Sequence, residues 1–170
     1  MIKPWIFEFF GAPIEFHAKF DASKSARYFD AYLDLWASAE PAGFEGIFFS
    51  EHHFGAAYSP APNLLIASVA TRTKTLRLGT LGMVPPYHTP WQLIEEIGML
   101  DHLTGGRLEI GTAAGRGHTA RPLAWRRRRS RQPGSDNTRT CLYLLRSGRS
   151  PVRDRPAPLQ PRFTQLIIAK

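Results

Sequence analysis

Residues 46–54 read Gly-Ile-Phe-Phe-Ser-Glu-His-His-Phe, and the interpretation of the fold starts from this stretch. Its first five residues form a short apolar run with the length and composition of a buried strand. The run passes directly into the polar residues Glu51, His52 and His53. A strand that is apolar on both faces is typical of a parallel sheet covered by helices. We therefore expect these polar side chains at the carboxyl end of a buried strand.

The sequence on either side alternates between predicted strands and predicted helices. We expect further strands at 2–10, 76–81 and 108–111, and helices at 25–40, 63–72 and 89–102. Thr89 and Gln92 have the spacing of a capping box, with Pro90 at the first helical position. Gly105 and Gly106 then end that helix. The order over residues 2–111 is therefore β-α-β-α-β-α-β.

This order predicts an α/β fold with a parallel sheet, because helical crossovers connect successive parallel strands. Four strands are half of an eight-stranded (β/α)₈ barrel of the TIM type, which takes about 250 residues. Half of a doubly wound sheet has the same order. The turn Gly11-Ala12-Pro13 after the first strand lacks the glycine spacing of a dinucleotide-binding loop, which favours the barrel. The fold class is thus the N-terminal half of a barrel, followed by an irregular basic tail.

The net charge of +8 conceals two parts of opposite sign. Residues 1–115 carry 8 Lys and Arg against 12 Asp and Glu, a net charge of −4. Residues 116–170 carry 14 basic side chains against only Asp136 and Asp154, a net charge of +12. We place the domain boundary here: 1–115 is the partial barrel, and 116–170 is an Arg- and Pro-rich tail.

The single cysteine, Cys141, excludes a disulfide within the chain and favours a reducing compartment. The first ten residues contain Glu8 and lack the basic region followed by an apolar run that marks a secretory signal, and no apolar stretch is long enough to span a bilayer. We expect a cytoplasmic protein without membrane contact.

Five motifs, in this order and at these spacings, resemble the bacterial luciferase-like monooxygenases over about residues 3–115. They are Glu51-His52-His53-Phe54, Pro62-Asn63-Leu64, Leu76 to Thr80, Pro85 to Pro90, and the run Leu100 to Leu108 that contains Thr104-Gly105-Gly106-Arg107. The remainder of the chain does not match.

The resemblance implies a (β/α)₈ barrel enzyme in which reduced FMN and O₂ oxidise a small organic substrate at the carboxyl face. The deazaflavin F420, used by relatives for hydride transfer, is the alternative cofactor. The resemblance also implies a flavin reductase as partner and a dimeric assembly of intact family members.

Carried over position by position, His52 resembles the catalytic histidine that follows the second strand. Leu81-Gly82 resembles the cofactor-binding bulge after the third strand, where the family often has a non-proline cis peptide facing the flavin. Ala113 resembles the end of the fourth strand, which borders the flavin. Family members often carry cysteine or arginine there, so the alanines at 113 and 114 give no phosphate or thiol role to this chain.

The residue types and their positions relative to the predicted strands, taken without the resemblance, indicate the same site residues. Side chains after strand carboxyl ends line the sites of such barrels, and histidine is suited to proton transfer near neutral pH. His53 is expected to be structural, because neighbouring strand residues face opposite sides. Glu51 either orients a histidine or faces the helix layer, and we favour the second. Tyr87 and His88 either contact substrate or form a polar turn. Two adjacent histidines without a third ligand do not predict a metal site.

Three interpretations of the tail stay open. It is a nucleic-acid arm, a solvated linker, or the product of a reading-frame shift near residues 114–117, and we favour the last. Sparse aromatic residues argue against a nucleic-acid partner. A non-catalytic, truncated protein with a polyanion-binding tail is the corresponding functional alternative. We predict no fifth strand beside residues 108–111, because Arg- and Pro-rich sequence disfavours strand formation.

Overall fold

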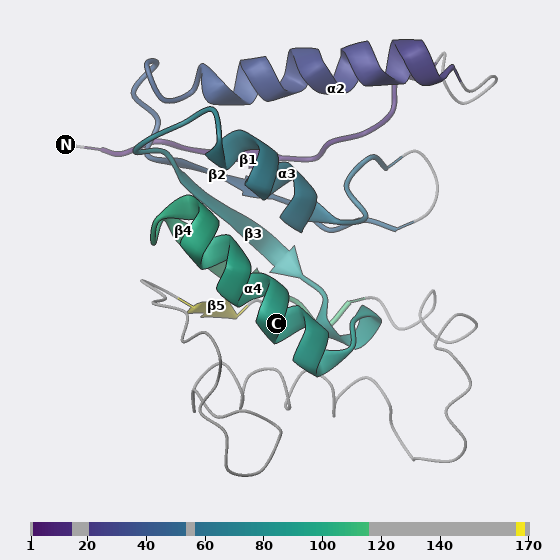
Figure 1. Cartoon of the computed structure of the whole chain (residues 1–170), viewed down its shortest axis with the longest axis vertical. Helices are drawn as coiled ribbons and strands as arrows, with labels where there is room; N and C mark the ends of the chain where they lie inside the picture. Colours follow the sequence, from purple (N-terminus) through teal and green to yellow (C-terminus); the bar gives the residue numbers. More distant parts are fainter. Residues whose placement is uncertain (1, 15–20, 54–56, 116–165, 169–170) are drawn as a thin grey trace.

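The structure, a computed structural model, describes residues 2–14, 21–53, 57–115 and 166–168 (Figure 1). The elements are β1 (Trp5–Glu8), α2 (Ala22–Ala37), β2 (Gly46–Phe49), α3 (Pro62–Ala70), β3 (Arg77–Met83), the 3₁₀ turn η1 (Pro85–Tyr87), α4 (Pro90–Thr104), β4 (Leu108–Thr112) and β5 (Leu166–Ile168). Every strand and helix predicted over residues 2–111 is present, with ends displaced by at most three residues.

The strands form one parallel sheet in the order β1-β2-β3-β4-β5. Trp5 lies opposite Gly46, which lies opposite Arg77, so the first three strands begin at the same level. The register shifts once, between Thr80 and Met83 in β3. Because all strands run the same way, their carboxyl ends meet at one edge of the sheet. The predicted parallel arrangement is confirmed.

The prediction that no fifth strand pairs with residues 108–111 was wrong. Leu166 lies opposite Ile110, and Ile168 opposite Thr112, in parallel register. That prediction weighed the Arg- and Pro-rich composition of the tail as a whole. Strand pairing, however, needs only a short local run of suitable residues, and Leu-Ile-Ile is such a run. The segment 116–165 between the two strands lies outside the described residues.

Helices α2, α3 and α4 pack against one face of the sheet, where alternate strand residues are fully buried (Figure 1). Ile47, Leu78 and Ile110 on this face are each 0% exposed. Trp36 of α2 and Ile97 of α4 belong to the same apolar cluster. Burial of each such side chain contributes about 1.5–3 kcal/mol, so this layer holds the strand ends in place.

The opposite face of the sheet carries aromatic and charged side chains. Trp5 and Phe48 stack across β1 and β2 with ring centroids 4.6 Å apart, and Phe7 is 50% exposed. The Nε–H of Arg77 donates to Glu109 Oε1 at 2.7 Å, joining β3 to β4. In a closed barrel the face away from the helices is the interior. This face therefore corresponds to the interior of the predicted barrel.

The helix ends follow local sequence signals in two of three places. Asp21 caps α2 by accepting the N–H of Lys24 at 3.0 Å, so α2 begins three residues before the predicted start. Gly105 ends α4 in the left-handed conformation at φ 64°, as predicted. The capping box predicted at Thr89 was wrong: Thr89 has cap-like extended backbone angles, but its side chain makes no capping hydrogen bond.

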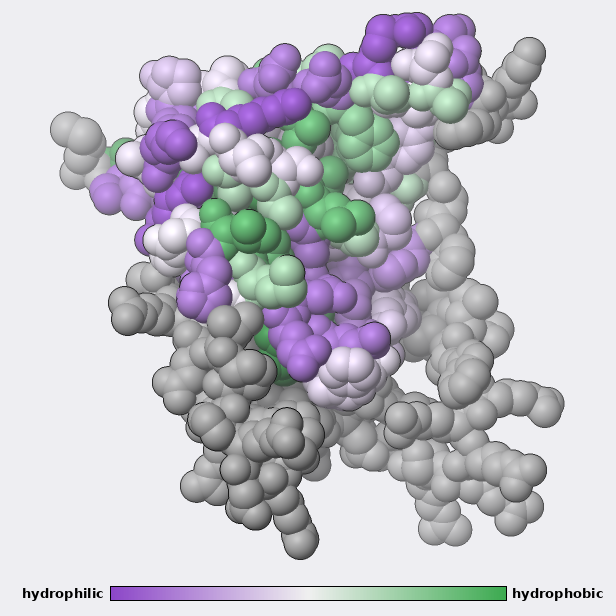
Figure 2. Space-filling view, in the orientation of Figure 1, coloured by the Kyte–Doolittle hydropathy of each residue, from purple (hydrophilic) through white to green (hydrophobic). Residues whose placement is uncertain are grey.

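The outer surface of α2 is hydrophilic, whereas hydrophobic side chains gather below it in the region of α3 (Figure 2). Leu64 of α3 and Met99 and Leu103 of α4 are among the exposed large apolar residues. No helix among the described residues combines the length and the apolar character needed to cross a bilayer.

Candidate functional site

Glu51 lies two residues past the end of β2, and its side chain is completely buried. Its Oε2 accepts the backbone N–H of Val84 at 2.7 Å. Its Oε1 lies 2.7 Å from Nε2 of His53 and 2.9 Å from Nε2 of His88. One carboxylate thus joins the end of β2 to the segment that follows β3.

Both imidazole rings turn a nitrogen toward this carboxylate. A carboxylate accepts hydrogen bonds, so each ring carries its proton on the Nε2 that faces Glu51. Burial lowers the pKa of His88, but the hydrogen bond and charge of Glu51, with the charge of Glu96, outweigh burial and raise it above its usual range. The ring of His53 also contacts Tyr87 edge-on, with centroids 4.8 Å apart.

His52 occupies the opposite side of the chain from Glu51 and His53. Its ring lies against Phe9, with centroids 4.4 Å apart, and Phe9 in turn contacts Phe7 of β1. Its backbone N–H donates to the Ser59 carbonyl at 3.1 Å. His52 therefore lies on the aromatic side of the sheet, whereas His53 lies on the side of the Glu51 carboxylate, in agreement with the expected alternation.

Leu81 and Gly82, expected after the third strand, lie within β3 at its register shift, and they approach the end of β4. The peptide bond between Leu81 and Gly82 is cis, as the family resemblance implies. A Cβ atom at Gly82 would lie 3.0 Å from the Thr112 carbonyl carbon and 3.2 Å from the Ala113 Cβ. The N–H of Ala113 donates to the Met83 carbonyl at 2.7 Å. The close approach of the end of β4 therefore leaves little room for a side chain at position 82, which explains the glycine there.

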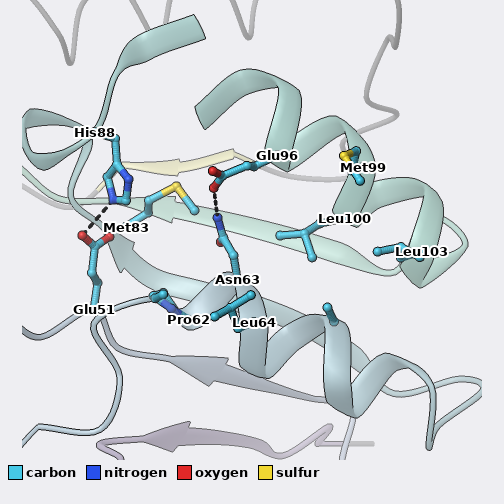
Figure 3. A pocket seen from close by; sticks show the side chains of 12 residues that line it. Glu51, Pro62, Asn63, Leu64, Met83, His88, Glu96, Met99, Leu100 and Leu103 are labelled. Carbon is cyan, nitrogen blue, oxygen red and sulfur yellow. Dashed lines mark hydrogen bonds and ion pairs between the residues drawn. The ribbon is translucent and has the colours of Figure 1, made fainter. Parts of the chain in front are cut away.

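A cavity of about 400 Å³ lies between α3 and α4, on the helix side of the sheet (Figure 3). Glu51 and His88 stand at one end of it, and Met99 and Leu103 line its wall on α4. Asn63 of α3 donates to Glu96 Oε2 of α4 at 2.9 Å, which links the two helices. Glu51 thus reaches toward the helix layer, as expected, and also holds two histidines, which was the less favoured interpretation.

The parallel register brings His52, Leu81, Gly82 and Ala113 to the same edge of the sheet, because they follow or end the neighbouring strands β2, β3 and β4. The group formed by Glu51, His53 and His88 was not predicted from the sequence. Two signals could have found part of it. Residues 51 and 53 share one side of an extended chain, and His88 follows the adjacent strand in the loop that leads into α4.

The fold and the site together define a parallel α/β protein with a group of polar side chains at the carboxyl edge of its sheet. The family model for luciferase-like monooxygenases matches residues 10–136, which is most of the chain, and the protein belongs to that family. The match continues past the boundary that we predicted at residue 115.

Relatives and solved structures agree with this assignment. The chain is 36% identical over 96 residues to the oxygenase component of the flavin-dependent trigonelline monooxygenase of Acinetobacter baylyi, covering 56% of this chain and 27% of that protein. It superposes on the oxygenating constituent of 3,6-diketocamphane monooxygenase of Pseudomonas putida, solved in complex with FMN, with a TM-score of 0.68 at 20% identity, covering 86% of this chain and 40% of that one.

A third likeness, to the coenzyme F420-dependent tetrahydromethanopterin reductase of Methanopyrus kandleri, has a TM-score of 0.63 at 17% identity and covers 98% of this chain and 50% of that one. At such identities the structures show the fold alone, which is that of TIM-barrel luciferase-like proteins. The matched part spans between a fifth and a third of the curated relatives' length.

Proposed function

We propose that this protein is, or forms part of, a flavin-dependent monooxygenase that uses reduced FMN and O₂ to oxidise a small organic substrate. The observation that carries the proposal is the placement of His52, Gly82 and Ala113 at the same carboxyl edge of the sheet, with an aromatic side chain, Phe9, against His52. Sites of parallel barrels lie at this edge. The trigonelline enzyme, which matches in sequence, is named a flavin-dependent oxygenase.

The residues at this edge fit the ring portion of a flavin. Gly82 and Ala113 present little side-chain bulk, and Leu81 and Phe9 add apolar surface. Reduced FMN, when bound, would supply two electrons to O₂, so that one oxygen atom could enter the substrate and the other leave as water. His52 would hold or transfer a proton there, and Phe9 would keep water from one face of its ring. In such barrels the phosphate group commonly binds after strands seven and eight, so we expect weak flavin binding by this chain alone.

Flavin binding tests the proposal and separates FMN from F420. The purified chain is titrated anaerobically with reduced FMN and with reduced F420, and binding is followed by the change in flavin absorbance and fluorescence. We expect weak binding of FMN that is lost in His52→Ala and kept in the exposed control His102→Ala. Preferential binding of F420 would instead favour hydride transfer on the same scaffold.

The role of His52 is tested in a full-length relative with the same Glu-His-His-Phe motif. Replacement of the matching histidine by alanine should slow substrate oxidation by roughly 100-fold or more, since a positioned proton donor or acceptor contributes that much. The melting temperature should stay unchanged. An unchanged turnover number would make this histidine structural.

Two partners belong to the proposal. The trigonelline protein is named an oxygenase component, so a separate flavin reductase would supply the reduced flavin here too.

A second copy of the chain would cover the exposed apolar residues Leu64, Met99 and Leu103 beside the α3–α4 cavity. Sedimentation of the parent and of Leu103→Glu tests this contact: the variant should sediment as a monomer at concentrations where the parent is a dimer.

A further inference from the structure

Glu51 connects two segments that are separate in the sequence. Its own position follows β2, His53 lies two residues on, and Val84 and His88 belong to the segment between β3 and α4. All of these bonds end on a carboxylate whose side chain is 0% exposed. Burial of a carboxylate is costly unless it is fully bonded, and here each oxygen has at least one donor.

We propose that Glu51 is a positioning residue, whose carboxylate fixes the orientation of His53 and His88 and, through the Val84 N–H, the segment that carries Tyr87 and His88 beside the end of β2. This rests on the proposed function, because that edge of the sheet is where the flavin and substrate would lie. Glu51 would act only through the two rings and the loop, and it leaves direct chemistry to His52 on the other side of the chain.

The hydrogen-bond distances, and the way the two carboxylate oxygens share their partners, support a positioning role rather than a purely structural one. Oε1 serves both rings at 2.7 and 2.9 Å, while Oε2 serves the backbone at 2.7 Å, so movement of the carboxylate displaces both rings together. The edge-on contact between His53 and Tyr87 adds a second link between the same two segments. The charged group that faces His88 from α4 is Glu96, and its carboxylate also accepts a hydrogen bond from Asn63.

Nuclear magnetic resonance of the unaltered chain gives the first test. In the chain with ¹⁵N-labelled histidines, the nitrogen shifts report which ring nitrogen carries the proton. We expect both His53 and His88 to be protonated on Nε2 at neutral pH, since each Nε2 faces Glu51. A ring found protonated on Nδ1 alone would overturn the proposal, and this measurement needs no variant.

Variants of Glu51 then distinguish the effect of its charge from the effect of the position of its carboxylate. Glu51→Gln keeps the size and removes the charge, so the titration midpoint of His88 should fall and the Val84 amide should exchange roughly tenfold faster or more. Glu51→Asp keeps the charge on a shorter side chain, so the midpoint of His88 should stay nearer to that of the parent while Val84 still exchanges faster. Glu45→Gln, which alters a partly exposed carboxylate bonded to Lys3, is the matched control and should change neither.

Identical His88 titrations in the parent and in Glu51→Gln would contradict the positioning role. So would an unchanged exchange rate at Val84 in both Glu51 variants. None of these measurements uses flavin. A chain that binds no flavin but shows the expected tautomers and shifts would therefore count against the proposed function and leave the role of Glu51 standing.

Discussion

At the scale of single residues, Glu40 shows how one side chain joins two elements. It follows α2, and its carboxylate accepts the backbone N–H groups of Lys74 and Thr75, at 3.0 and 2.5 Å, in the turn before β3. The Thr75 hydroxyl donates to the same carboxylate. This hydroxyl and the backbone N–H groups hold the pKa of Glu40 below its usual range, although burial acts in the opposite direction.

We predict that Glu40→Gln destabilises the protein at neutral pH by about 1 kcal/mol, since the bonds to the charged carboxylate are near solvent. A pKa that is lowered in the folded state stabilises the protein above the pKa of the unfolded chain, and this contribution is lost as the pH falls through the folded-state value. The difference between parent and variant should therefore shrink in acid. Urea unfolding at several pH values measures it, with the exposed Glu95→Gln as control; a pH-independent difference would contradict the assignment.

The residue scale also shows what sequence reasoning could and could not predict in the site. His52, Gly82 and Ala113 follow or end predicted strands, so the parallel topology placed them correctly at one edge. The bonds of Glu51 could not be predicted in the same way. They depend on the path of the loop after β3, which brings Val84 and His88 back toward β2, and no periodic pattern of residues encodes that path.

At the scale of elements, Arg107 holds together the amino end of the sheet. The Arg107 guanidinium donates to the carbonyls of Thr104 at the end of α4, of Leu76 before β3 and of Ala70 at the end of α3. It also bonds both the hydroxyl and the carbonyl of Thr73. Helix carboxyl ends leave carbonyls without intrahelical donors, and a cation satisfies them with favourable charge. The arginine of the Thr-Gly-Gly-Arg motif is thus structural in this chain.

We predict that Arg107→Ala destabilises the protein by about 2–4 kcal/mol, because several buried carbonyls lose their donor at once. Arg107→Lys should recover less than half of that loss, since an ammonium cannot reproduce the planar fork of a guanidinium. Urea unfolding followed by circular dichroism measures both, and Arg72→Ala, which removes exposed ion pairs to Asp30 and Asp34, is the control. Equal stability of the Lys variant and the parent would show that charge alone matters.

The helices and strands were predicted from the sequence more completely than the contacts of the site. The stripe of α2 and the buried runs of β2 and β4 follow directly from the period of their apolar residues, and Gly105 marks the end of α4. The failure at Thr89 has a physical reason. Pro90 at the first helical position requires only the extended backbone that Thr89 adopts, so the helix starts without a side-chain cap.

At the scale of the whole molecule, the described residues form a sheet of five parallel strands, with helices on one face and aromatic residues on the other. The curated relatives are several times longer than the matched part, and Phe7 and Phe9 on the aromatic face are 50% and 63% exposed. In a complete barrel this face would be covered by the remaining strands. The exposed aromatic side chains are those that the remaining strands would cover, and the division of the chain at residue 115 stays a prediction.

The pairing of β5 with β4 contradicts our expectation for the tail, and hydrogen exchange can test it directly. If Leu166 to Ile168 pair as described, their amides and those facing them in β4 should exchange slowly with deuterium, even though 116–165 separate the two strands. Replacing both Leu166 and Ile167 by proline should release this protection, because alternate residues of a parallel strand bond the neighbouring strand and one of these two must face β4. Ile167→Thr keeps the N–H and a β-branched side chain, so protection should persist. Fast exchange at 166–168 in the parent would instead favour a partial barrel that ends at β4. It would also favour the interpretation of the tail as the product of a reading-frame shift. The nucleotide sequence around codon 115 would then test that interpretation.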